Sequence, residues 1–94
     1  NQTRLAAIIA ERSALRYTPA GLPALDLMLA HQSTQSEAGH ERQVALQMRA
    51  LAIGTQAEQL ATLELGRPLR FQGFLASPRQ GKSVVLHIQN FQQD

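Results

Sequence analysis

Residues 76–83, ASPRQGKS, have the spacing of a relaxed phosphate-binding loop. In such a loop a glycine amide, a lysine and a serine bind phosphates and magnesium, and the loop opens a helix whose N-terminus faces the phosphate. Here the residues after Ser83 read VVLHIQ, which is β-branched and alternating, as in a strand. The segment therefore predicts a basic hairpin turn that exposes Arg79 and Lys82, in place of a nucleotide-binding site.

A second group of candidate chemical residues lies in one polar segment and consists of His31, Glu37, His40 and Glu41. Their spacing matches no structural metal site, and the chain has no cysteine for a thiolate ligand or a disulfide. Asp26, five residues before His31, offers with it neither a nucleophile nor an obvious acid–base pair. We therefore expect no metal, no cofactor and no catalytic residue, and a protein that is not an enzyme.

The basic residues point to a different chemistry. The net charge is +2, from nine basic and seven acidic residues, and eight of the nine bases are arginines. Guanidinium groups bind phosphate in a bidentate manner and stack on bases. So small a net charge favours nucleic acid only if the bases gather on one face, and the alternative is an ordinary solvated surface. There are four aromatic residues for stacking: Tyr17, Phe71, Phe74 and Phe91.

Length and hydropathy place these residues on one small domain, residues 1–94. No apolar run approaches the roughly 20 residues of a membrane span, and the first apolar stretch lacks the preceding basic block of a signal peptide. We therefore expect no contact with a membrane.

The first half of the chain predicts three strands. Residues 4–16 fit a helix or a strand, and the prolines and alternation that follow favour a long strand. Residues 18–23, with Pro19, Gly21 and Pro23, predict a rigid hairpin connection, because proline and glycine fix its dihedral angles. In the next strand, residues 24–30, Leu25, Leu27 and Leu29 should face the core.

The third strand is expected after a loop. Residues 32–41 are polar without periodicity and predict that loop. Residues 42–53 predict the strand, and because Leu51 and Ile53 are out of phase with Val44, Leu46 and Met48, we expect a bulge at Arg49–Ala50.

The second half predicts one helix and two strands. Thr55 and Glu58 form a capping-box pattern that begins a helix of two to three turns, which Gly66 ends. Strands at 69–76 and 84–89 follow from their alternation. The chain is therefore predicted to be all-β, a five-stranded barrel of the oligonucleotide/oligosaccharide-binding (OB) type with one short helix between the third and fourth strands.

On such a barrel, ligands bind across the second and third strands and the flanking loops. We expect Arg12 and Arg16 by the first elbow, Arg42 at the start of the third strand, and Arg79 with Lys82 on the last hairpin to gather at this rim. Tyr17 either stacks on a base or lies across the barrel rim.

The chain also resembles the primosomal replication protein N family, small OB-fold proteins of bacterial replication restart. The resemblance spans essentially the whole chain and is carried by four segments, RYTPAGLPALDLML at 16–29, LAHQSTQSEAGHERQVALQM at 29–48, RFQGFLAS at 70–77 and VVLHIQN at 84–90. Some family members carry aromatic residues where this chain has His40 and Ala45, and we include His40 among the expected nucleic-acid contacts.

The resemblance implies a cytoplasmic, nucleoid-associated homodimer that binds single-stranded DNA without sequence preference, contacts the restart helicase and helps to bring in the helicase-loader partner protein. It assigns basic DNA contacts to Arg16, Arg42, Arg79 and Lys82. Three alternatives remain open: an adaptor whose grooves bind peptide, a generic single-stranded-DNA-binding protein, and a nucleotide-binding enzyme built on residues 76–83.

Overall fold

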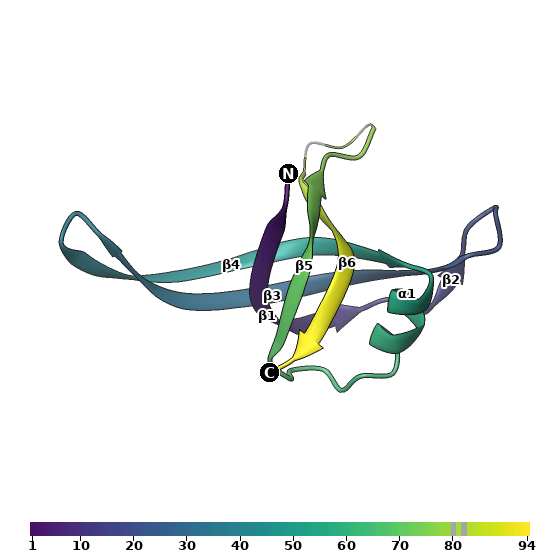
Figure 1. Ribbon diagram of the computed structural model, residues 1–94, viewed down its shortest axis with the longest axis horizontal. Coiled ribbons are helices and arrows are strands. Elements are labelled where there is room, and N and C mark those ends of the chain that lie inside the picture. Colours follow the sequence, from purple (N-terminus) through teal and green to yellow (C-terminus); the bar gives the residue numbers. More distant parts are fainter. Residues whose placement is uncertain (80, 82) are drawn as a thin grey trace.

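The computed structural model describes residues 1–79, 81 and 83–94. The described residues form six strands and one helix: β1 (Thr3–Arg12), β2 (Arg16–Tyr17), β3 (Pro23–Glu37), β4 (His40–Ile53), α1 (Thr55–Leu60), β5 (Leu69–Ala76) and β6 (Val85–Gln93). The strand order is β1-β5-β6-β4-β3-β2, and an additional β1–β3 pairing closes five of the strands into a barrel (Figure 1). The predicted all-β OB-fold is thereby confirmed, with its one helix between β4 and β5.

The segment 4–16 is strand, interrupted between β1 and β2. β1 pairs with β5 through residues 3–7 and with β3 through residues 8–12, with a register shift between Ile9 and Glu11. This change of partner closes the barrel. The two residues of β2 then extend the sheet along the start of β3.

The elbow at 18–23 connects β2 to β3 as predicted. The Thr18 amide donates to the Leu22 carbonyl at 2.8 Å, and the Gly21 amide donates to the Thr18 carbonyl at 2.8 Å. Gly21 has φ +86°, a conformation that side-chain-bearing residues rarely adopt. The connection therefore needs a glycine at this position.

The core fills the barrel. Leu25, Leu27 and Leu29 are buried as the alternation predicted. They pack against the other members of one buried cluster, which includes Ile9, Ala50, Ala52, Ala57, Leu60, Leu69, Phe71, Leu86 and Ile88. Each buried leucine stabilises the fold by about 1.5–3 kcal/mol relative to an exposed one.

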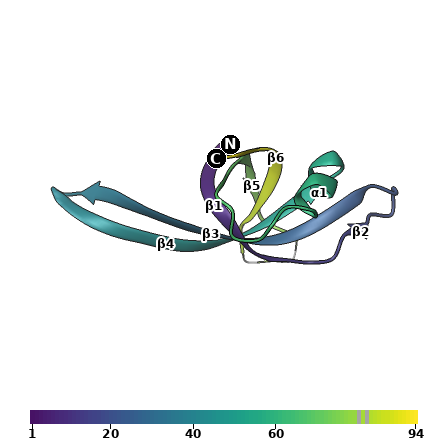
Figure 2. The ribbon, with the colours of Figure 1, turned by 90° about the horizontal axis from the view of Figure 1, so that it is seen from below.

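The loop predicted at residues 32–41 is wrong, because this segment is a long β-ribbon. β3 runs to Glu37, β4 starts at His40, and the register between them is continuous from Glu37↔His40 to Ala24↔Ile53. Ala38 and Gly39 both have positive φ, as in the two-residue turns that join antiparallel strands. The outer part of this ribbon projects from the barrel (Figures 1 and 2). Both of its faces are in contact with solvent, so its residues are polar on both sides and do not alternate between apolar and polar. We call residues 31–46 the arm.

The bulge predicted at Arg49–Ala50 is also wrong. The β3–β4 register contains no shift at this point. Ala50 and Ala52 continue the inward phase of Met48 and are 3% and 0% exposed, whereas Leu51 and Ile53 lie on the opposite face. In this part of β4 the inward residues are small and the outward residues are large, so the larger apolar residues are on the face opposite to the core. The described strands instead have register shifts at Ile9/Glu11 and at Gln72/Gly73.

The helix is shorter than predicted and lacks the capping box. Gly54, not Thr55, is the N-cap residue, and no side chain caps the helix. Ala57 and Leu60 are buried, so that α1 packs against the β3 and β4 part of the barrel. None of the helical structure in the described residues is long and apolar enough to cross a bilayer.

The last two strands follow their predicted alternation, with Leu69, Phe71, Leu86 and Ile88 buried. β6 begins at Val85 and continues to Gln93, so it extends beyond the strand predicted at residues 84–89. A strand also follows residues 76–83, which is the context predicted for a hairpin and not for a phosphate-binding loop.

Candidate nucleic-acid interface

Arg16 and Tyr17 form β2, at the end of the barrel next to the elbow. The Arg16 Nε lies 2.9 Å from Asp26 Oδ2, and its terminal nitrogen lies 3.3 Å from Oδ1. The hydrogen bond to the Asp26 carboxylate, followed by its charge, raises the pKa of Arg16. The side chains of this pair are 52% and 53% exposed, so Arg16 is accessible but electrostatically compensated. Tyr17 is 67% exposed and does not lie buried against the barrel rim.

Arg12 has a structural position that the sequence did not predict. Its guanidinium donates to the Leu60 carbonyl at 2.9 Å and also to the Leu63 carbonyl. The Leu60 carbonyl lies at the C-terminal end of α1, where backbone acceptors lack helical partners, and Leu63 follows in the bend after the helix. Arg12 therefore fastens the helix to the end of β1.

His40 and Arg42 lie at the tip of the arm. His40 is exposed and pairs with Glu37 across the turn. Arg42 Nη1 lies 3.2 Å from Glu37 Oε1, and the two side chains are 63% and 68% exposed. An ion pair this exposed leaves the guanidinium free to exchange partners, because it is worth at most about 1 kcal/mol.

The expected gathering of the bases at one rim is wrong. Arg16 pairs with Ala24 and Arg42 with Gln35, and these partners are eleven residues apart on β3, a separation of about 36 Å at 3.3 Å per residue. Arg79 is exposed on the β5–β6 connection, a third projection of the ribbon diagram (Figure 1). Lys82 lies outside the described residues. Arg16, Arg42 and Arg79 are thus dispersed over three projections.

Between these projections the outer face of the barrel carries a feature that was not predicted from the sequence. The rings of Phe74 and His87 stack with centroids 4.7 Å apart and an interplanar angle of 8°. They are cross-strand neighbours on β5 and β6, and His87 is in turn the register partner of Leu51 on β4. A hollow of about 260 Å³ beside the stack, which we call the outer groove, is lined by Asp26, Leu27, Arg49, Ala50, Leu51, Pro78, Val85 and His87.

The outer groove combines an aromatic surface with a cation. Arg49 is exposed, and no salt bridge among the described residues involves it. Asp26, the carboxylate in the lining, is already engaged by Arg16. Stacked rings beside a guanidinium are suited to bind a base and its phosphate together. The strand alternation could have shown that Arg49, Phe74 and His87 face outward, but not that they are neighbours.

Among the polar residues considered as metal ligands, His31 forms hydrogen bonds within the protein. The His31 Nδ1 lies 2.6 Å from the Ala6 carbonyl oxygen, and its Nε2 lies 2.9 Å from the Ser33 hydroxyl. The His31 ring therefore links the base of the arm to β1. Over residues 1–79, 81 and 83–94, no three His, Cys, Asp or Glu side chains are grouped as a metal site would require.

Comparison with known proteins agrees with this architecture. Residues 1–90 match a family described as "Another single-strand binding protein family". The chain is 48% identical over 90 residues to a protein named Replication restart protein PriB from Bordetella pertussis, covering 95% of this chain and 84% of that protein. It is 40% identical over 94 residues to the PriB of Neisseria meningitidis serogroup B, covering 99% and 93% of the two chains.

Solved structures of PriB and of single-stranded DNA binding proteins are also similar to this chain. A PriB structure from Ralstonia solanacearum is 36% identical, has a TM-score of 0.89 and is covered over 96% of its length by 99% of this chain. The single-stranded DNA binding protein of Thermus aquaticus is 32% identical with a TM-score of 0.79, and this whole chain covers 50% of it. Sequence and fold agree over nearly every residue, and the chain therefore belongs to this single-strand binding protein family and, within it, to the PriB replication restart proteins.

Proposed function

We propose that this chain is a non-catalytic accessory protein of bacterial replication restart that binds single-stranded DNA without sequence preference. The observation that carries the proposal is the Phe74–His87 stack beside Arg49 in the outer groove. Stacking on a ring is tolerant of base identity, because every base has a π-face, and this property favours binding without sequence preference. The names of the curated relatives supply the process, replication restart.

The dispersed arginines fit an extended ligand better than a compact one. Arg16, Arg42 and Arg79 lie on three projections, and each is exposed. A strand of DNA that passes through the outer groove extends from it in both directions. These residues, together with Tyr17, His40 and Lys82, therefore serve as peripheral contacts in the proposal. The central contact is then stacking, and the periphery supplies salt-sensitive attraction.

The proposal includes a homodimer. The inner face of the ribbon continues past the core as Met48, Leu46 and Val44, and Leu46 is 39% exposed. In addition, β1 residues 3–7 pair with β5 on one edge, while pairing with β3 begins only at Ile8. An apolar stripe beside an open strand edge is a surface that a second copy would cover.

A contact with the restart helicase, and assistance to its loader, completes the proposal. Three of the exposed large apolar residues, Tyr17, Leu22 and Ile53, are 67%, 50% and 43% exposed. They lie at the same end of the β3–β4 ribbon, because Tyr17 pairs with Pro23, Ile53 pairs with Ala24, and Leu22 precedes both partners. Tyr17 and Ile53 face opposite sides of the sheet there, because their partners are consecutive residues. We call them the elbow cluster, and it also favours the second candidate function, a protein–protein adaptor with little DNA binding.

Fluorescence anisotropy with labelled oligo-dT at low salt tests the central proposal. We expect saturable binding that weakens with salt and is similar for oligo-dT and mixed sequences. The absence of binding at about 50 µM protein, equivalent to an affinity weaker than roughly 5.9 kcal/mol, would contradict DNA binding and leave the adaptor function. ATP turnover lost in Lys82→Ala would instead support the nucleotide-binding enzyme.

A further inference from the structure

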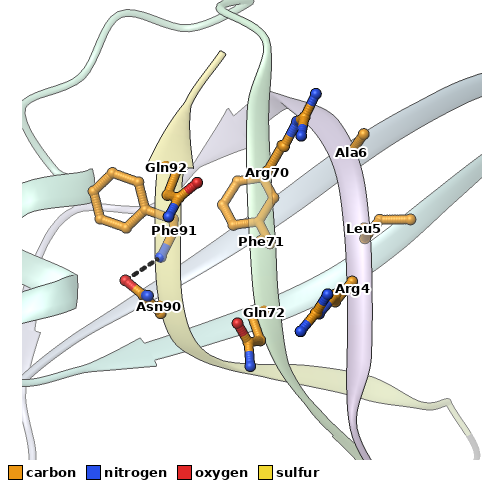
Figure 3. Close-up of a pocket in the computed structure, with 9 residues that line it drawn as sticks. All are labelled: Arg4, Leu5, Ala6, Arg70, Phe71, Gln72, Asn90, Phe91 and Gln92. Atoms are coloured by element: carbon orange, nitrogen blue, oxygen red, sulfur yellow. Dashed lines mark hydrogen bonds between the residues drawn. The ribbon is translucent and has the colours of Figure 1, made fainter.

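The outward face of β1, β5 and β6 carries a second hollow, distinct from the outer groove. Its volume is about 490 Å³. Two cross-strand rows lie on this face, Arg4–Gln72–Asn90 and Ala6–Arg70–Gln92, as the paired registers of β1–β5 and β5–β6 show (Figure 3). We call these six residues the platform.

The platform is polar and has unused hydrogen-bonding capacity. Arg70 Nε lies 2.9 Å from Asp94 Oδ1, and Asn90 Oδ1 accepts a hydrogen bond from the Phe91 amide at 2.9 Å. Among the described residues no hydrogen bond or ion pair is formed by the side chains of Arg4, Gln72 or Gln92. Carboxamides both donate and accept, so the platform can serve either a phosphate oxygen or the edge of a base.

The platform is continuous with the outer groove along β5. Arg70, Gln72 and Phe74 occupy alternate positions on the same side of this strand, whereas Leu69, Phe71 and Gly73 are buried on the other side. The span from Arg70 to Phe74 is four residues, or about 13 Å. A ligand stacked on Phe74 and His87 therefore reaches the platform without crossing an apolar ridge.

We propose that the platform is a second subsite for the same single strand of nucleic acid, holding its backbone after it leaves the outer groove. The inference rests on the proposed function and names a surface outside the rim predicted from the sequence. Arg4 supplies the main attraction, because Arg70 is already paired with Asp94. The carboxamides of Gln72, Asn90 and Gln92 supply sequence-tolerant hydrogen bonds.

Charge and shape favour this occupant over two others. A second copy docked face to face would oppose Arg4 and Arg70 to the same arginines, and Asp94, the carboxylate beside them, is already engaged. A peptide would need an apolar anchor, but the large apolar residues that line the hollow, Leu5, Phe71 and Phe91, alternate with the platform residues and pack in or against the core. An anionic, hydrogen-bonding chain matches what the surface offers.

The test compares Arg4→Ala with Arg67→Ala, which removes the same charge from the α1–β5 connection, outside the platform. Anisotropy is measured with labelled oligo-dT of about 5 and about 16 nucleotides, which lie near the lower and upper ends of the site sizes of single OB domains. For the longer oligonucleotide we expect Arg4→Ala to weaken binding about two- to fivefold. We also expect it to reduce the slope of log affinity against log salt by about 0.7. Arg67→Ala should match the wild type, and neither variant should affect the shorter oligonucleotide.

A gain-of-function variant keeps the test independent of any loss of structure. Gln92→Lys adds a cation to the platform, and we expect tighter binding of the longer oligonucleotide and a steeper salt slope. Equal behaviour of Arg4→Ala and Arg67→Ala, with no gain from Gln92→Lys, would overturn the platform subsite while the wild type still binds the short oligonucleotide. Failure of the wild type to bind either oligonucleotide would overturn the proposed function itself. Light scattering confirms that the variants share one oligomeric state.

Discussion

The rings of Phe74 and His87 lie parallel, 4.7 Å apart, although they are thirteen residues apart in the sequence and sit on different strands. The stack places a flat aromatic surface on the outside of a small barrel, and neither residue belongs to the buried core cluster. We expect Phe74→Ala or His87→Ala to weaken binding of oligo-dT by about 1–3 kcal/mol, the value of one stacked base. Fluorescence anisotropy measures the change.

The matched control for the stack is His87→Phe, which keeps a ring and removes the titratable nitrogens. It should restore binding to near the wild-type level. If His87→Phe binds as weakly as His87→Ala, stacking is not the contribution of this residue. Thermal unfolding of each variant separates loss of binding from loss of fold.

Asp26 forms a salt bridge with Arg16, a candidate DNA contact, and so compensates its positive charge. Asp26→Asn keeps the shape of the side chain, removes its charge and releases Arg16. We expect affinity for oligo-dT at low salt to rise about two- to fivefold. The same substitution in an Arg16→Ala background should give a smaller gain, and an equal gain in both backgrounds would show that Asp26 acts only through general repulsion.

Gly73 lies at the register shift between β5 and β6. A Cβ atom at this position would come within 1.9 Å of the His87 carbonyl oxygen, a backbone atom, so that the backbone of β6 or β5 would have to shift. We expect Gly73→Ala to destabilise the protein by about 3 kcal/mol or more, measured by urea unfolding. It should also weaken DNA binding, because the displaced residue carries one ring of the stack.

Gly66 offers a comparison for that prediction. It has φ +85°, but nothing lies within 4 Å of the place that a Cβ atom would take, so strain alone acts there. Gly66→Ala should cost only about 1–2 kcal/mol. Similar losses at both positions would show that the close approach at Gly73 relaxes easily.

The exposed stripe on the arm predicts an effect on oligomeric state. Leu46→Asp places a charge in the centre of the stripe formed with Val44 and Met48, and we expect it to shift the protein from dimer to monomer in light scattering at micromolar concentration. Ala45→Asp, on the opposite face of the same strand, is the matched control and should remain dimeric. Dimers in both variants would place the interface elsewhere.

The elbow cluster predicts a separation of two activities. Leu22→Ser removes the most exposed aliphatic side chain of the elbow, which is not part of the lining of the outer groove. Helicase stimulation should fall at least about fivefold, as for an interface residue worth about 1 kcal/mol or more, while binding of oligo-dT is unchanged. Arg79→Ala should show the reverse pattern. Loss of both activities in Leu22→Ser would mean that stimulation depends on DNA binding.

The strand pattern was predictable wherever one face of a strand is buried and the other is wet. Leu25, Leu27 and Leu29 on β3 and Phe71 on β5 are such cases, and each proved to be buried. Prediction failed where that contrast disappears. On the arm both faces meet solvent, so a paired ribbon was mistaken for a loop. On β4 the inward residues are the small Ala50 and Ala52, so a regular strand was mistaken for a bulged one.

Local chemistry, by itself, determined the turn at 18–23, the hairpin in place of a phosphate loop at 76–83, and the all-β class, because these depend on dihedral preferences and alternation between near neighbours. The tertiary structure alone decided which residues share a surface. Barrel closure carried Arg16, Arg42 and Arg79 to separate projections, turned Arg12 to the end of the helix, and brought Phe74, His87 and Arg49 together. Such proximity arises from strand register, which is set by pairing across the whole sheet and leaves no trace in the spacing of residues along one strand.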